Sequence, residues 1–150
     1  MSRILSRFVQ NHWKDPKNLI QVLMGPRQVG KTTLITELTE HLSEGSFLYA
    51  SADLPSPPTP DFIISHWSKV RALKVEKPTL VLDEIQKIPR WSETVKMLWD
   101  EDQRHKKIMN IWLLGSSAIL IEKGLSESLT GRFELNFLPH WIFLECEKTF

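Results

Sequence analysis

The sequence predicts an α/β protein with a parallel five-stranded sheet that carries helices on both faces. Three observations support this fold class: five segments of strand length and apolar character, segments with helical apolar spacing between them, and a glycine-containing loop between the first strand and a helix. Strands that alternate with helices form right-handed crossovers, which place helices on both faces of a parallel sheet. The 150 residues are expected to form one domain.

The first half of the chain alternates helical spacing with continuous apolar runs. The expected elements are a helix over residues 3–13, a strand over 19–24, a helix over 34–42 and a strand over 46–51. Four prolines between residues 55 and 60 then exclude regular structure. Thr59 and Pro60 provide a cap and a first-turn proline for a helix that should end near Lys74.

The second half contains three more strands. The expected elements are a strand over residues 79–82, a helix that begins at 91, a strand over 108–114, a helical segment over 118–123 and a strand over 133–138. The basic run at residues 104–107 should lie at a helix C-terminus, where positive charge compensates the helix dipole. Four residues without interleaved aromatic side chains are too few for a nucleic-acid groove, so the dipole interpretation is favoured.

The composition is ordinary for a soluble globular protein, with 41% apolar and 25% charged residues. A net charge of +1 argues against a strongly electrostatic nucleic-acid or membrane binder. The single cysteine, Cys146, excludes an internal disulfide, and no apolar run is long enough to span a bilayer. The N-terminus lacks the pattern of a secretory signal, so a cytoplasmic location without membrane insertion is expected.

The loop after the first expected strand fits the phosphate-binding pattern G-x-x-x-x-G-K-[ST] without a mismatch. The residues expected to bind the nucleotide are Gly25, Pro26, Arg27, Gln28, Val29, Gly30, Lys31, Thr32 and Thr33. The two glycines allow a tight turn, whose N–H groups surround a polyphosphate together with the positive end of the following helix. Lys31 should reach the β- and γ-phosphates, and the Thr32 hydroxyl should bind Mg²⁺, with Thr33 a lesser candidate.

Two polar pairs follow expected strands: Asp83 and Glu84 follow the strand over 79–82, and Ser116 and Ser117 follow the strand over 108–114. Parallel strands bring their carboxyl ends to the same edge of a sheet, so the two pairs should lie close together. Asp83 should hold Mg²⁺ through its water shell, and Glu84 should polarise the water that attacks the γ-phosphate. Ser116 or Ser117 should hydrogen-bond this water or the phosphate, and Asp53 is expected at the same edge. The structural alternatives are a solvated acidic turn and a tight serine turn.

Arg132 is the candidate for stabilising charge on the transferring phosphoryl group, as an arginine finger does. A surface ion pair is the alternative, and the spacing does not decide between them. A GTPase is disfavoured because the chain has no N-K-x-D element and no D-x-x-G after its acidic strand. A kinase is disfavoured because an acidic residue directly after the metal-binding aspartate favours water as the acceptor.

The chain contains, in this order, GPRQVGKTT, LVLDEIQ followed by Ile88 and Pro89, LLGSSA, and SLTGRFELNFLPHWIF. These segments resemble those of prokaryotic AAA-type P-loop ATPases, and the resemblance covers about Phe8 to Glu145. It implies a P-loop NTPase fold with the AAA-like strand order 5-1-4-3-2. The roles that it implies are Walker A for Lys31 and Thr32, Walker B for Asp83 and Glu84, the sensor position for Ser116, and the arginine after an L-x-G turn for Arg132.

In the family that the chain resembles, a helical lid and a C-terminal domain follow the ATPase core, whereas this chain stops at Phe150. Residues 1–150 are therefore expected to form a core truncated before both. The expected function is hydrolysis of ATP to ADP with Mg²⁺, with Arg132 acting on its own nucleotide or on that of a neighbour in a homo-oligomer. The alternative is a module that binds nucleotide without turnover, because a lid helps to exclude water. DNA is a partner by family analogy alone.

Overall fold

The computed structural model describes residues 19–24, 40, 42, 45–116 and 118–137. Its elements are β1 (Ile20–Met24), β2 (Phe47–Ser51), α3 (Asp61–Arg71), β3 (Thr79–Asp83), the 3₁₀ turn η1 (Ile85–Lys87), α4 (Trp91–Arg104), β4 (Asn110–Gly115), α5 (Ala118–Ser128) and β5 (Phe133–Phe137). All five expected strands are present, with small shifts at their ends. The helices expected over residues 3–13 and 34–42 lie outside the described residues.

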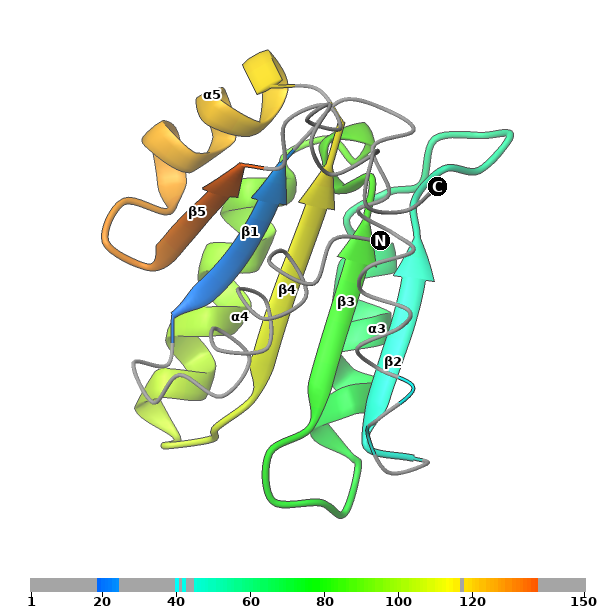
Figure 1. The fold of residues 1–150 in the computed structure, drawn as a ribbon, viewed down its shortest axis with the longest axis vertical. Helices are drawn as coiled ribbons and strands as arrows, with labels where there is room; N and C mark the ends of the chain where they lie inside the picture. Colours follow the sequence, from blue (N-terminus) through cyan, green and yellow to red (C-terminus); the bar gives the residue numbers. More distant parts are fainter. Residues whose placement is uncertain (1–18, 25–39, 41, 43–44, 117, 138–150) are drawn as a thin grey trace, which may run out of the picture.

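The strands form one parallel sheet in the order β2-β3-β4-β1-β5 (Figure 1). This is the predicted order 5-1-4-3-2 read from the other side, so the prediction is confirmed. The register aligns Ser51 with Asp83, and Met24 with both Gly115 and Phe137. The carboxyl ends of the strands therefore meet at one edge of the sheet, at the top of Figure 1, which we call the carboxyl edge. The opposite edge is the amino edge.

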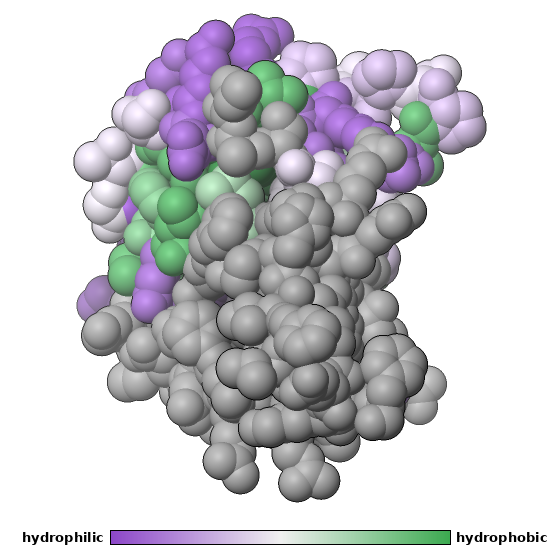
Figure 2. Space-filling model, turned by 45° about the horizontal axis from the view of Figure 1, so that its top comes forward, coloured by the Kyte–Doolittle hydropathy of each residue, from purple (hydrophilic) through white to green (hydrophobic). Residues whose placement is uncertain are grey.

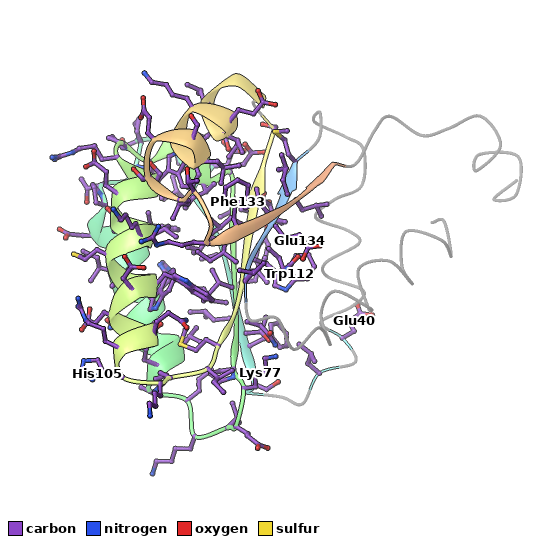
Figure 3. The ribbon with its side chains drawn as sticks, turned by 90° about the vertical axis from the view of Figure 1, so that its left-hand side faces the viewer. Glu40, Lys77, His105, Trp112, Phe133 and Glu134 are labelled. Carbon is purple, nitrogen blue, oxygen red and sulfur yellow. The ribbon has the colours of Figure 1, made fainter. Side chains whose placement is uncertain are left out.

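Helices α3, α4 and α5 pack against one face of the sheet (Figures 1 and 3). Alternate strand residues point to this face and join the apolar sides of the helices in the hydrophobic core. Trp67 of α3, Trp99 of α4 and Leu125 of α5 are each at most 5% exposed. The apolar spacing that predicted these helices therefore marks the side that each one buries.

The other face of the sheet is buried as well. Leu23, Val81, Trp112 and Leu114 alternate with the core-facing residues and are at most 2% exposed. Figure 3 shows Trp112 on the side of the sheet away from α4. A sheet that is buried on both faces needs apolar residues at consecutive positions, which explains the continuous apolar runs of β1, β3 and β4.

The predicted cap and end of α3 were both wrong. Pro60 already has helical dihedral angles, so the carbonyl of Thr59 accepts the Phe62 N–H (3.0 Å), and the described residues provide no side-chain cap. The helix ends at Arg71 instead of near Lys74, because the Leu73 N–H bonds to the Val70 carbonyl (3.1 Å) in a tighter 3₁₀-type turn, and the Lys107 ammonium binds the Arg71 carbonyl beside it. Local sequence indicates a cap but cannot show which donor reaches a carbonyl from another element.

The basic run lies where the dipole interpretation expected it. Helix α4 ends at Arg104, and His105 is its C-cap residue. Figure 3 shows His105 at the end of the helix that lies away from the carboxyl edge. Helix α5 is longer than expected, because it continues from Lys123 to Ser128. Leu125 lies in this added turn and is buried in the core, so tertiary packing extends the helix.

The surface at the carboxyl edge is largely polar over the described residues, and apolar surface gathers to the left in Figure 2. The exposed apolar side chains include Leu120 on α5 and Leu135 on β5, at 50% and 40% exposure. Isolated exposed leucines are common on protein surfaces. Among the described helices, none has the length and hydropathy to cross a bilayer.

A buried polar network joins α3 to α4. The Trp67 indole N–H donates to Asp102 Oδ2 (2.7 Å), and Arg71 Nε lies 2.7 Å from Asp102 Oδ1. Arg71 also donates to the Leu98 carbonyl (3.0 Å). Asp102 is only 4% exposed, and a buried carboxylate is tolerated only when its charge is paired and hydrogen-bonded. The network therefore fixes how the two helices pack.

Replacing Trp67 with Phe should reduce the free energy of unfolding more than Trp99→Phe does, by about 1.5–3 kcal/mol, because a hydrogen bond to a charged group is lost only at position 67. Trp99 is a matched control, since it is also buried in the core and loses the same ring area. Urea unfolding of the two variants measures the difference. Equal losses would show that the Trp67 hydrogen bond adds nothing to packing.

Candidate active site

The carboxyl edge brings together segments that are far apart in the sequence. Met24 at the end of β1 pairs with Gly115 at the end of β4, and Asp83 at the end of β3 pairs with Ser51. The expected phosphate-binding loop, residues 25–33, follows Met24 directly and lies outside the described residues. The strand that leads into this loop therefore lies beside the strand that leads into Ser116.

Hydrogen bonds from two described residues hold the Asp83 carboxylate in place. The Tyr49 hydroxyl on β2 donates to Oδ2 (2.6 Å), and the Glu84 backbone N–H donates to Oδ1 (2.8 Å). Tyr49 pairs with Val81, two residues before Asp83, so tyrosine and aspartate lie on the same face of the sheet. Asp83 is 6% exposed, so a carboxylate of fixed orientation stands at the carboxyl edge.

Glu84 turns the chain away from β3 with a left-handed backbone (φ 53°, ψ 42°). This conformation costs about 1–2 kcal/mol for a residue with a Cβ atom. Its Oε2 atom accepts hydrogen bonds from Ser116 Oγ (2.8 Å) and Gln86 Nε2 (2.6 Å). Gln86 Nε2 also donates to Ser116 Oγ (3.3 Å). We call Glu84, Gln86 and Ser116 the Glu84 cluster; Glu84 is 8% exposed within it.

The glycine before Ser116 leaves room for this cluster. A Cβ atom at position 115 would lie 2.6 Å from Ile121 Cδ1 and 3.0 Å from Gln86 Oε1. The first distance is shorter than any normal contact between carbon atoms. Because Gly115 has no side chain, Ile121 packs against the end of β4 while Gln86 reaches Glu84.

Asp53 lies at the carboxyl edge, where the sequence placed it. It forms an ion pair with Lys87 of η1, and its backbone N–H donates to Ser51 Oγ (3.2 Å). The Asp53 side chain is 59% exposed. The ion pair links the segment after β2 to the turn after β3, so the structure gives Asp53 a local tethering contact.

Arg132 lies at the amino edge instead. Its carbonyl accepts the Ile20 N–H at the start of β1 (2.9 Å), so the length of that strand, about 16 Å at ~3.3 Å per residue, separates it from the carboxyl edge. Its Nε and Nη2 donate to the two carboxylate oxygens of Asp100 on α4, at 2.7 and 3.1 Å. This hydrogen bonding raises the pKa of the Arg132 guanidinium above its ordinary value. Gly131 forms the preceding turn at φ 82°, which glycine adopts without strain.

The structure therefore brings Asp83, Glu84 and Ser116 together and does not bring Arg132 to them. For Arg132 it shows the ion pair that the sequence left as the alternative. Action of Arg132 on a nucleotide at its own carboxyl edge is not compatible with this position. Ser117 lies outside the described residues, as do the expected nucleotide-binding residues 25–33.

Two residues of the site were not predicted from the sequence, Tyr49 and Gln86. Tyr49 was read as part of a second strand, although alternation along paired strands would have placed it on the face of Asp83. Gln86 stands between the buried residues Ile85 and Ile88, and a polar side chain in such a turn is a signal for a specific partner. The signal for Tyr49 depends on knowing that β2 and β3 are neighbours, whereas that for Gln86 does not show which partner the side chain has.

The two carboxylates at the carboxyl edge, those of Asp83 and Glu84, have different hydrogen-bond partners. Mg²⁺ uses oxygen ligands and usually keeps several waters, so one fixed carboxylate such as Asp83 suits it. Glu84 is a second carboxylate, hydrogen-bonded to a hydroxyl that enters from the neighbouring strand. The separate partners of the two carboxylates allow separate roles, one toward a cation and one toward a proton.

Comparison with known proteins places the chain by sequence and by fold. A family model described as an AAA domain matches residues 17–146. A search of curated proteins found no match.

Two solved structures have similar folds. One, from a study of the structural basis for katanin self-assembly, has a TM-score of 0.56 and 23% sequence identity, over 90% of this chain and 46% of that chain. The other is the T158V variant of RuvB from Thermotoga maritima, with a TM-score of 0.58 and 21% identity, over 87% of this chain and 41% of that chain. The chain thus spans less than half the length of either protein, and at these identities the similarity concerns the fold.

Gly115→Ala should reduce the free energy of unfolding by about 1–3 kcal/mol, because its new methyl group overpacks the end of β4. Ile121→Val removes the nearest atom, Cδ1, so it should recover part of this loss in the double variant. Thermal or urea unfolding of the two single variants and the double variant gives the coupling between the sites. Full stability of Gly115→Ala would contradict the close packing described here.

Proposed function

Because the chain belongs to the AAA family of P-loop ATPases, we propose that it binds ATP with Mg²⁺ and hydrolyses it to ADP and phosphate. The observation that carries this proposal is the hydrogen bond from Ser116 Oγ to Glu84 Oε2 at the carboxyl edge (2.8 Å). Open parallel sheets bind their ligands beyond the carboxyl ends of the strands. A carboxylate and a hydroxyl held together there are suited to act on a water molecule.

In the proposed reaction, a water attacks the γ-phosphorus of ATP. The bond from the γ-phosphorus to the oxygen that bridges to the β-phosphate breaks, and ADP leaves with the bonding electron pair. Glu84 orients the water and accepts its proton as the new P–O bond forms. Ser116 holds the Glu84 carboxylate through the hydrogen bond between β4 and the β3 turn.

The triphosphate is proposed to lie in the loop of residues 25–33, with Lys31 on the β- and γ-phosphates. Asp83 and the Thr32 hydroxyl are the proposed protein ligands of Mg²⁺ or of its waters. Bound Mg²⁺ would neutralise charge on the phosphate oxygens. Asp83 fits this role because the Tyr49 hydroxyl and the Glu84 N–H already fix its carboxylate.

For Arg132 we propose a role between subunits. It lies at the amino edge, remote from the Glu84 of its own chain, and its side chain is 32% exposed. In a homo-oligomer, the Arg132 guanidinium of one subunit would leave its ion pair with Asp100 and bind the γ-phosphate of the nucleotide on the next subunit. An arginine that neutralises charge in the transition state raises the rate by about 10³- to 10⁵-fold.

A second candidate function is nucleotide binding without turnover. In the family that the chain resembles, a lid helps to exclude water from the bound nucleotide, and binding without turnover is what remains when that closure does not occur. This candidate predicts ATP binding without phosphate release. A cytoplasmic location is part of the proposal, and DNA as a partner rests on the family resemblance alone.

Lys31→Ala should weaken ATP binding, whereas Glu84→Gln should retain binding and lower kcat by about 10²- to 10⁴-fold, because it removes the proton acceptor. A fluorescent ATP analogue measures binding, and a colourimetric phosphate assay measures turnover. Glu93→Gln is the matched control, since Glu93 is exposed on α4. Turnover retained in Glu84→Gln would remove Glu84 from the mechanism, and wild-type binding without phosphate release would favour the second candidate.

If Arg132 acts on a neighbouring subunit, Arg132→Ala and Lys31→Ala should each be inactive alone and should regain activity when mixed. The first variant then contributes an intact nucleotide site, and the second contributes an intact arginine. Phosphate release from the mixture measures the recovery, with Arg104→Ala as a control for loss of an exposed arginine. Undiminished activity of Arg132→Ala alone would restrict this residue to its ion pair with Asp100.

A further inference from the structure

Gln86 lies in a short turn between two buried isoleucines. It is the middle residue of η1, and its neighbours Ile85 and Ile88 are at most 1% exposed. The left-handed backbone of Glu84 turns the chain just before it, so the side chain at position 86 faces the carboxylate at position 84. The amide is thus directed at the Glu84 carboxylate by the backbone.

One amide group of Gln86 contacts both other members of the Glu84 cluster. Its Nε2 atom donates to Glu84 Oε2 (2.6 Å) and to Ser116 Oγ (3.3 Å), while Ser116 itself donates to the same Glu84 oxygen (2.8 Å). The three hydrogen bonds close a triangle across the ends of β3 and β4. In this arrangement Glu84 cannot rotate without losing contacts to both partners.

The Gln86 amide is oriented so that its nitrogen donates to the Glu84 carboxylate, which leaves its oxygen without a described partner. Gln86 Oε1 is buried and has no hydrogen-bond partner within the part of the chain that the structure describes. The opposite orientation would place this oxygen against the Glu84 carboxylate, and two acceptors cannot share a hydrogen bond. Leaving a buried acceptor unpaired costs free energy, so the contact to Glu84 offsets that cost.

We infer that Gln86 is a positioning residue for hydrolysis, whose amide holds the Glu84 carboxylate and the Ser116 hydroxyl as one unit. This inference rests on the proposed function, in which Glu84 accepts the proton of the attacking water. A glutamate side chain has three rotatable bonds, and a general base must stand within hydrogen-bond reach of its water. Gln86 removes this freedom before the nucleotide is bound, because a misplaced catalytic group costs much of the rate.

The sharpest variant is Gln86→Glu, which keeps the size and shape of the side chain and replaces the donating nitrogen with an acceptor. It should lower kcat by about 10- to 100-fold with little change in KM for ATP, because nucleotide binding does not use residue 86. Gln86→Leu, which removes all hydrogen bonding, should show the same pattern. Gln103→Glu and Gln103→Leu are matched controls on the exposed side of α4 and should retain the wild-type rate.

A double-variant cycle with Ser116→Ala tests whether the two residues act as a unit. Because both donate to Glu84 Oε2, the combined loss in kcat should be smaller than the product of the two single losses. Losses that multiply would show that Gln86 acts independently of Ser116 and would contradict the proposed unit.

The side-chain amide protons of Gln86 give a measurement that does not need turnover. NMR should identify them by their loss in Gln86→Glu, and they should exchange with solvent more slowly in the wild type than in Glu84→Ala, which lacks the acceptor. Equal exchange rates in the two proteins would overturn the inference. A wild-type rate of phosphate release in Gln86→Glu would also overturn it. Protected amide protons in a wild-type protein that releases no phosphate would contradict the proposed function alone.

Discussion

The register between β3 and β4 is the constraint on which the candidate site depends. Leu82 pairs with Leu113, so Glu84 and Ser116 leave the sheet side by side and come within hydrogen-bond distance. A shift of one residue would turn every side chain of one strand to the other face. Trp112 fills one face and the smaller Ile111 and Leu113 fill the other, so such a shift would disrupt the close packing of both buried faces. The packing that stabilises the domain therefore also sets the distance between the two reactive groups.

Much of the fold was predictable, because each element carries a strong local pattern. Apolar runs and, for β5, an alternating segment predicted the five strands, and the family resemblance predicted their order, which the structure confirms. The errors lie where elements meet. Helix α3 ends early, where the Lys107 ammonium binds its last carbonyl, and α5 extends because Leu125 reaches the core. Neither contact can be inferred from the residues near the helix end itself.

The candidate site was predictable for residues that follow strands and less so for their partners. Asp83, Glu84 and Ser116 were identified because parallel strands end at one edge. Arg132 lies just before β5. A residue that precedes a parallel strand lies at the amino edge, but the motif match gave Arg132 a role without using this rule. Gln86 was missed because its contact depends on a left-handed residue, which is rare for glutamate.

The left-handed backbone of Glu84 has a consequence for how this position would change under selection. Glycine and asparagine adopt that conformation more easily than glutamate does. Selection for thermal stability alone would therefore favour either of them at position 84, and both lack a carboxylate. A library screened only for resistance to heat should accumulate such replacements, whereas one screened for phosphate release should retain the acid. At position 84, thermal stability and catalysis thus favour different side chains.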